Sequence, residues 1–165
     1  MAEHDRRTDS AVATDVVEED WLVTDQLAPA TSGQLAPLYE AAAAGVLALP
    51  LCAQCRQVLE LEQTVCDQCG STTSTWEPVA LSGVVHSATM VHRIEPDLLH
   101  VRDPYPVVDV ELTSGHRLVL TTTSPVTSLP AIGDPVTVGF RRIGNVSLPA
   151  VLSTLSSLEQ PEVRP

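Results

Sequence analysis

The amino-acid sequence predicts a mainly β protein, in which a short helix and a four-cysteine zinc ribbon precede an antiparallel β-barrel of five to six strands. Two observations carry this prediction. The four cysteines stand in two C-x-x-C pairs separated by ten residues, which is a spacing typical of structural zinc sites. From residue 76 onward, short alternating β-prone runs are separated by Gly, Pro, Asp and Ser, as in small barrels and sandwiches.

The composition argues against a nucleic-acid partner. The chain of 165 residues has a formal net charge of −12, with 21 acidic residues against nine basic ones, and every basic residue is arginine. Nucleic-acid binders concentrate positive charge, and those that bind single strands add aromatic platforms. Here the only aromatic residues are Trp21, Tyr39, Trp76, Tyr105 and Phe140.

The sequence also carries no sign of export or membrane insertion. No stretch reaches the roughly 18 apolar residues of a membrane span, and the N-terminus is acidic where a signal peptide would begin with basic residues. We therefore expect a cytoplasmic protein that does not bind membranes. In that compartment, paired cysteines favour a metal site over disulfides.

The chain divides into four predicted segments: an acidic, flexible tail over residues 1–36, a helix plus zinc ribbon over 37–75, a barrel over 76–153, and a polar C-terminal tail over 154–165. One apolar island, Trp21 to Val23, interrupts the first tail. It is either a chance apolar patch or a segment that orders on a partner or across its own barrel.

The segment PLYEAAAAG predicts a short helix that begins at Pro37 and ends at Gly45. Leu38, Ala42 and Val46 follow one another at four-residue spacing, which predicts an apolar stripe for packing.

Cys52, Cys55, Cys66 and Cys69 are the predicted ligands of one structural zinc ion. Zinc favours four thiolates at about 2.3 Å in closed sites, and such a site stabilises a fold but leaves no position for a substrate. Iron in the same four-sulfur site is the alternative. We expect the intervening residues, RQVLELEQTV, to form the hairpin of the ribbon, and Gly70 to suit the tight turn after the second pair.

The predicted barrel strands follow from alternation. Residues 83–92 are long enough for one curved strand, and Val108, Val110 and Leu112 share one face of the next. Thr113, Ser114 and Gly115 predict a turn into a strand in which Leu118 and Leu120 share a face; Val136, Val138 and Phe140 mark another, and a last strand covers 146–151. Such short strands commonly close into an OB-like Greek-key barrel, although a small sandwich has the same local pattern.

No catalytic residue is predicted with a recognisable motif, since G-x-S-x-G, H-E-x-x-H and P-loop sequences are absent. His86 and His92 would share a strand face and are interpreted as polar wall residues or as candidate bases. Five arginines in or beside the strands are either solvated or meet an anion such as a coenzyme A phosphate: Arg93, Arg102, Arg117, Arg141 and Arg142.

Taken in order, several pieces resemble one known family: the helix with Gly45, the two C-x-x-C pairs, Trp76, and the segments SGVVHSATMVHR, PYPVVDVEL and IGDPVTVGF. This is the family of zinc-ribbon and OB-fold proteins once catalogued as domain of unknown function thirty-five, found with acyl-CoA enzymes. The resemblance runs from about Leu38 to Val151. Two departures are Arg56, where the family often has glycine, and a ribbon hairpin without the usual proline and aromatic residues.

The resemblance implies a non-catalytic accessory subunit. Such a subunit would assemble with a thiolase-superfamily enzyme (a thiolase, a lipid-transfer-protein-like aldolase or a ketosynthase-like enzyme) or with a hydratase, and would help to bind or position acyl-CoA substrates. Two alternatives stay open. One is an OB-fold protein that binds single-stranded nucleic acid, and the other is a stand-alone acyl-CoA enzyme that uses His86, His92 or His116.

Overall fold

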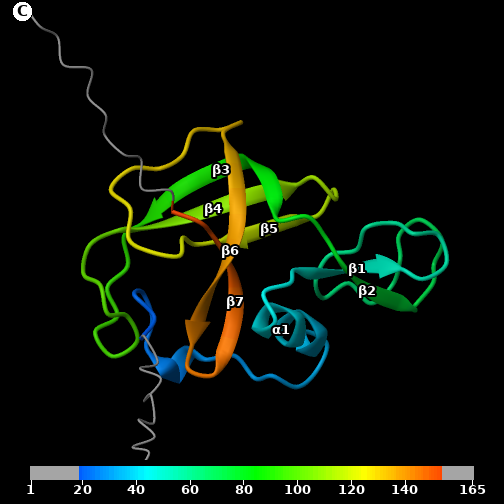
Figure 1. The fold of residues 1–165 in the computed structure, drawn as a ribbon, viewed down its shortest axis with the longest axis horizontal. Coiled ribbons are helices and arrows are strands. Elements are labelled where there is room, and N and C mark those ends of the chain that lie inside the picture. Colours follow the sequence, from blue (N-terminus) through cyan, green and yellow to red (C-terminus); the bar gives the residue numbers. More distant parts are fainter. Residues whose placement is uncertain (1–18, 154–165) are drawn as a thin grey trace, which may run out of the picture.

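The structure, a computed structural model, describes residues 19–153 (Figure 1). Its elements are the 3-10 helix η1 (Asp25–Leu27), the α-helix α1 (Ala36–Ala43) and the strands β1 (Ala48–Cys52), β2 (Ser74–Pro78), β3 (Ser82–Val91), β4 (Tyr105–Leu112), β5 (Arg117–Leu120), β6 (Pro135–Ile143) and β7 (Val146–Val151). Residues 1–18 of the predicted N-terminal tail (1–36) and the whole predicted C-terminal tail (154–165) lie outside the described residues. None of the helices in the described part is long and apolar enough to cross a membrane.

Five strands form a nearly closed antiparallel barrel, in the order β5-β4-β3-β6-β7 (Figure 1). The two end strands meet where Thr122 forms a parallel bridge with Val151. There, the Val151 N–H donates to the Thr121 C=O (2.8 Å) and the Thr123 N–H donates to the Val151 C=O (2.9 Å). The predicted mainly β fold with an OB-like barrel is confirmed.

The barrel core is built from the predicted alternation. Every second residue of β4 and β5 is buried, including Val108, Val110, Leu112, Leu118 and Leu120. At the end of this hairpin, Gly115 adopts a φ of 84° and the Leu112 N–H donates to the His116 C=O (2.8 Å). This three-residue turn with glycine in the left-handed region sets the register of the two strands.

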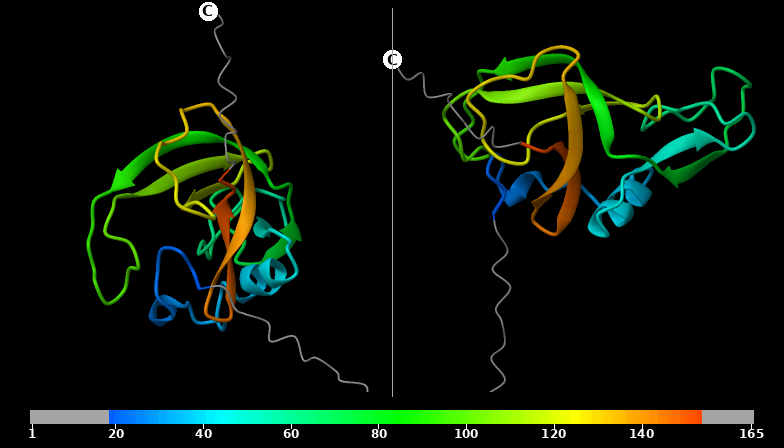
Figure 2. Two further views of the ribbon diagram at one scale, coloured as in Figure 1. Left: turned by 60° about the vertical axis from the view of Figure 1, so that its left-hand side comes forward. Right: turned by 45° about the horizontal axis from the view of Figure 1, so that its top comes forward.

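Strand β3 is one long, curved strand, as predicted, and it pairs with β4 along its length and with β6 at its start (Figure 2). A β-bulge between Val85 and Ser87 bends it. At Gly83, a Cβ atom would lie only 2.6 Å from the Glu111 carbonyl oxygen, so no larger residue fits without moving the β4 backbone.

Helix α1 and strand β1 belong to the same core as the barrel. Leu38, Leu47 and Leu49 are buried together with the inner residues of β4, β5, β6 and β7. Of the predicted stripe, Leu38 and Ala42 are buried. Val46, however, lies beyond the end of the helix and is 37% exposed, because the helix stops before it at Gly45, whose φ is 72°.

The two-stranded sheet of the ribbon consists of β1 and β2, which pair with Pro50 opposite Trp76. The prediction that residues 56–65 form the hairpin is therefore wrong. These residues add a single bridge, Leu51 to Val58, and then turn: the Gln63 N–H donates to the Glu60 C=O and the Gln63 side chain accepts from the Glu60 N–H. These turns place Leu59 against Cys52 and Cys66, where its side chain is buried.

Residues 20–28, which we call the strap, lie across one end of the barrel (Figure 2). Leu22 and Val23 are buried against Ile143 at the end of β6, and Trp21 donates its indole N–H to the Thr122 C=O (2.9 Å). Of the two interpretations of the apolar island, the structure supports packing across the chain's own barrel. Residues 20–28, which belong to the segment predicted as a flexible tail, are thus packed on the barrel. Trp21, Leu22 and Val23 supply the apolar area that the acidic residues around them lack. The predicted boundaries at residues 75 and 153 stay predictions.

A buried ion pair holds the strap. The Asp20 carboxylate, whose side chain is 1% exposed, lies 3.0 Å from the Arg141 guanidinium, whose side chain is 13% exposed. The same carboxylate accepts the N–H groups of Leu22 (3.0 Å) and Val23 (2.8 Å). Burial lowers the pKa of Arg141, while the charge and hydrogen bonds of Asp20 oppose that shift.

Replacing Asp20 with alanine should lower the free energy of unfolding by about 3 kcal/mol, because it leaves the Arg141 charge buried without a partner. Chemical denaturation measures this. The double variant D20A/R141M should recover part of the loss, whereas Glu19→Ala, at an exposed neighbouring position, should change the stability by less than about 0.5 kcal/mol. A D20A variant as stable as the E19A control would contradict this role of the pair.

Candidate functional site

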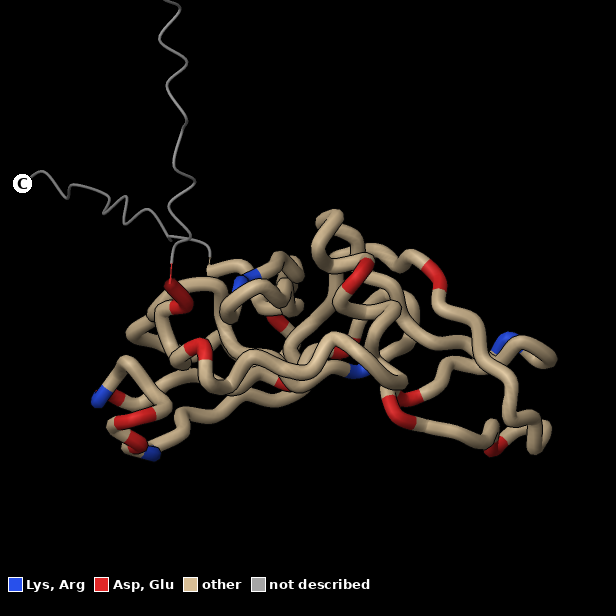
Figure 3. The backbone as a smooth tube through the Cα atoms, turned by 90° about the horizontal axis from the view of Figure 1, so that it is seen from below, with Lys and Arg blue, Asp and Glu red and all other residues tan. Residues whose placement is uncertain are grey.

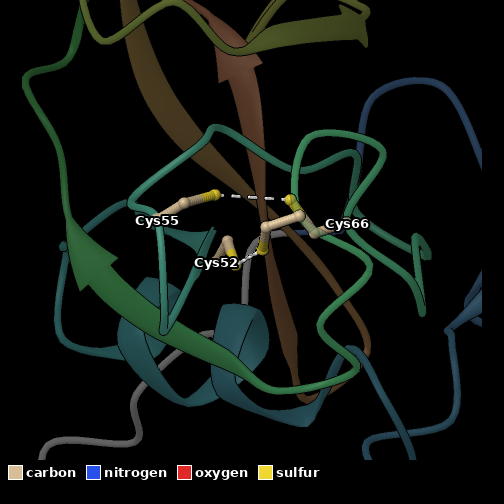
Figure 4. A group of neighbouring side chains, drawn as sticks. Cys52, Cys55 and Cys66 are labelled. Atoms are coloured by element: carbon tan, nitrogen blue, oxygen red, sulfur yellow. Dashed lines mark hydrogen bonds between the residues drawn. The ribbon is translucent and has the colours of Figure 1, made fainter.

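The four cysteines gather at one end of the ribbon. Their sulfur atoms all lie within 4.8 Å of one another; Cys52 Sγ is 3.5 Å from Cys69 Sγ, and Cys55 Sγ is 3.5 Å from Cys66 Sγ. Figure 4 shows the sulfurs of Cys55 and Cys66 facing one another, with Cys52 beside them. The first cysteine of each pair is buried and the second is exposed.

The two cysteine turns repeat the same hydrogen bonds. Cys52 donates its N–H to the Gln57 C=O and Cys66 donates to the Ser71 C=O, both at 2.8 Å. In each turn, the residue after the second cysteine donates its N–H back to the carbonyl of the first cysteine: Arg56 to Cys52 and Gly70 to Cys66. The sulfurs are thus held by main-chain bonds in two equivalent turns.

Arg56 and Gly70 occupy equivalent positions and share a left-handed backbone, with φ of 66° and 72°. This conformation is nearly free of strain for glycine and costs a residue such as arginine about 1 kcal/mol. The Arg56 side chain makes a two-pronged ion pair with Glu77 in β2 (2.5 and 2.6 Å). The departure from glycine noted in the sequence therefore leaves the shape of the turn intact.

The four thiols influence one another's protonation. The Cys55 N–H, aided by further hydrogen bonds and opposed by burial, lowers the pKa of Cys52 to about 6. The Ser71 N–H lowers the pKa of Cys69, but the three neighbouring sulfurs and burial outweigh it and raise that pKa to about 12. Four thiolates so close together repel one another, and a cation among them would offset that repulsion.

The cluster fits a metal ion. Tetrahedral zinc with sulfur ligands at 2.3 Å places neighbouring sulfurs about 3.8 Å apart, and the observed separations of 3.5 Å and up to 4.8 Å are close to this. Leu59 packs against Cys52 and Cys66 and keeps water from their side of the cluster. The four cysteines could therefore hold one ion, with sulfur at every position.

The predicted histidine candidates are not brought together. His86 is exposed at the bulge of β3, and His92 is exposed beyond the end of that strand. His116 is buried; its Nδ1 lies 2.9 Å from Ser114 Oγ and its Nε2 lies 3.0 Å from the Pro50 carbonyl oxygen. Since a carbonyl only accepts, Nε2 donates. His116 thereby joins the barrel to strand β1 of the ribbon.

Most of the arginine candidates already have carboxylate partners. Ion pairs join Arg93 to Glu95, Arg117 to Asp109 and Arg141 to Asp20. Within residues 19–153, Arg102 and Arg142 are exposed and form no ion pair. Acidic positions are more numerous than basic ones over the described chain (Figure 3).

The strap contacts both loops that flank the usual oligonucleotide-binding face of an OB fold. In OB folds, the second and third barrel strands form that face together with the loop joining the first two strands and the loop joining the last two; here the two loops are residues 92–104 and the β6–β7 turn. The strap bonds to both: Thr24 N–H donates to Leu98 C=O (2.9 Å), His100 N–H donates to Leu22 C=O (2.9 Å), and Gly144 N–H donates to Asp25 Oδ1 (2.8 Å). The run of Trp21 to Val23 in an acidic segment is its sequence signal.

Comparisons with known proteins agree with the fold. Residues 76–141 match the family model of the C-terminal OB-fold domain of ChsH2. A chain of the solved structure described as "Ltp2-ChsH2(DUF35) aldolase" is similar at 29% sequence identity, with a TM-score of 0.65; the match covers 75% of this chain and 97% of that one. A search of curated proteins gave no significant match. The resemblance to the zinc-ribbon and OB-fold family, domain of unknown function thirty-five, is thereby confirmed, by the family model over most of the barrel and by the solved structure over three quarters of the chain.

Proposed function

We propose that this chain is a non-catalytic accessory subunit that assembles with a thiolase-superfamily enzyme such as an aldolase. The observation that carries the proposal is the similarity to a chain of the Ltp2-ChsH2(DUF35) aldolase structure, which extends over 97% of that chain. The similarity extends beyond the barrel, since the barrel alone is less than 75% of this chain. A hydratase-like enzyme is the second kind of partner that the resemblance implies.

The arrangement of side chains supports an accessory role over the stand-alone enzyme. The four sulfurs face one another, which leaves no cysteine directed at a substrate. His116 is engaged with Pro50 and Ser114, and the exposed candidates His86 and His92 lie at different points of β3 and the loop after it. General acid–base catalysis needs a base within hydrogen-bond reach of a reacting group. In this proposal, residues of the partner perform the chemistry.

The strap weighs against the nucleic-acid alternative. The strap, held by Leu22, Val23 and the buried Asp20–Arg141 pair, bonds to both loops that OB folds use for a single strand, so a strand that used those loops would have to compete with it. The net charge of −12 adds repulsion of phosphates.

A finer part of the proposal is that the chain helps to position acyl-CoA for its partner. Arg102 lies in the β3–β4 loop and Arg142 lies near the end of β6, so both belong to the barrel end that carries the strap. Exposed guanidinium groups without carboxylate partners among the described residues are suited to coenzyme A phosphates.

The partner proposal is tested by affinity purification of the tagged chain from its native lysate, followed by mass spectrometry of what remains bound after a moderate-salt wash. We expect a thiolase-like or hydratase-like protein at near-equal stoichiometry. Recovery of the chain alone, or with nucleic acid, would contradict the proposal.

We also propose that the four cysteines hold one structural zinc ion, with iron as the alternative metal. Replacing the buried Cys52 or Cys66 with serine should reduce the bound metal from about one ion per chain to nearly none and unfold the ribbon, because the metal supplies about 10 kcal/mol to small zinc modules. Elemental analysis and circular dichroism measure both effects.

The matched control for these variants is Ala53→Ser, which adds a hydroxyl to the exposed part of the same turn and removes no sulfur. It should bind metal as the natural chain does. An unchanged zinc content in both cysteine variants would refute the metal assignment, and iron in place of zinc in the natural chain would correct the identity of the ion.

A further inference from the structure

A groove of about 600 Å³ lies between the barrel and the ribbon. Strand β5 forms one wall, and Leu148 and Pro149 of β7 form the opposite wall. Leu38 of α1 and the loop over residues 60–63, between the two cysteine pairs, complete the lining. The groove is open to solvent along β5, where Val119 is 71% exposed.

Among residues 19–153, no strand pairs with the groove side of the wall formed by β5, so it is an open strand edge. Leu112 and His116 form a hydrogen-bonded pair, and such pairs alternate along an antiparallel ladder. The register places Glu111 opposite Arg117 and Asp109 opposite Val119, so these two pairs are the ones without ladder bonds. The main-chain N–H and C=O groups of Arg117 and Val119 therefore point away from β4, toward the groove. Thr121, next in this series, does so too, since its C=O accepts from Val151.

Proline at position 149 explains why the barrel does not close here. In the β6–β7 ladder, Val151 directs its N–H away from β6 and toward Thr121. The next residue of β7 with the same direction is Pro149, two positions earlier, and it has no N–H to offer to the Val119 carbonyl. The seam between β5 and β7 is thus hydrogen-bonded at Val151 and open from Pro149 toward the start of β7.

The charges around the groove favour a basic occupant. Glu60 and Glu62 in the ribbon loop form no ion pair with another described residue, whereas Arg117 and Arg141 are paired with Asp109 and Asp20. The rim therefore carries unpaired negative charge. An anionic group such as a coenzyme A phosphate would be repelled, while lysine or arginine beside an apolar segment would be attracted.

We propose that this groove binds an extended segment of the partner enzyme, which adds as a short strand to the free edge of β5. This inference rests on the proposed accessory function. Strand addition uses the main-chain groups of Arg117 and Val119 for affinity and the lining leucines for apolar side chains. The segment is about four residues long, as β5 is, and it carries Lys or Arg at the end that meets Glu60 and Glu62.

The first test uses the chain and the thiolase-like or hydratase-like partner recovered with it, both purified. Val119→Pro removes the N–H that faces the groove and leaves the ladder bonds to β4 intact. It should therefore raise the dissociation constant about tenfold. The control Val119→Ala keeps that N–H and should bind within about threefold of the natural chain. Substituting both acidic residues, Glu60→Lys with Glu62→Lys, should also weaken binding.

The second test is hydrogen exchange on the natural chain, which needs no variant to fold. The amides of residues 117 and 119 should exchange fast in the free chain and slow down when the partner is added. A complex that forms with unchanged exchange at both amides, or a V119P variant that binds as tightly as V119A, would overturn strand addition and leave the accessory function standing. Slow exchange already in the free chain would mean that the chain's own tail occupies the groove and would equally overturn it. Absence of any complex would instead remove the accessory function itself.

Discussion

Three leucines from outside the barrel complete its core, and the placement of the helix, the ribbon and the groove depends on them. Leu38 comes from α1, and Leu47 and Leu49 come from the segment that leads into the cysteines, yet all three are buried with the inner residues of the strands. Burying a leucine contributes about 2 kcal/mol, so the helix and the first ribbon strand are held firmly on the barrel. The hydrogen bond from His116 to the Pro50 carbonyl adds a polar link at the same junction. The cysteine cluster and the groove beside β5 consequently keep fixed positions.

Two parts of the barrel surface differ in what covers them. The strap bonds to both loops that OB folds use for oligonucleotides, and it is held by a buried ion pair and two buried apolar residues. Beside the ribbon, Pro149 keeps the seam open, and within residues 19–153 an edge of β5 is left unpaired. An OB barrel whose ligand-binding loops are engaged by its own chain and whose strand edge is exposed is suited to a protein partner, which agrees with the accessory role.

The sequence predicted those features that depend on local pattern. Alternation placed Val108, Val110 and Leu112 on the inner face, the turn at Gly115 set the register, and cysteine spacing identified the cluster. Features that depend on long-range contacts were left open or missed. The sequence left open whether Trp21 to Val23 pack on the barrel, because Asp20 finds its partner Arg141 121 positions away. The ribbon strands were not predicted, because Leu49, Pro50 and Leu51 do not alternate between apolar and polar residues. The hydrogen bond from His116 to Pro50 and the groove beside β5 join residues far apart in the sequence, so local pattern could not predict them.

If this chain assists an enzyme whose own residues perform the chemistry, the complex should differ from both of its parts in activity. Steady-state turnover of an acyl-CoA substrate is therefore to be measured for the purified partner alone, for this chain alone and for the reconstituted complex. We expect no turnover by this chain, and a higher kcat/KM for the complex than for the partner alone. Turnover by this chain alone, or a partner whose kcat/KM is unchanged by its presence, would show that the accessory role is wrong.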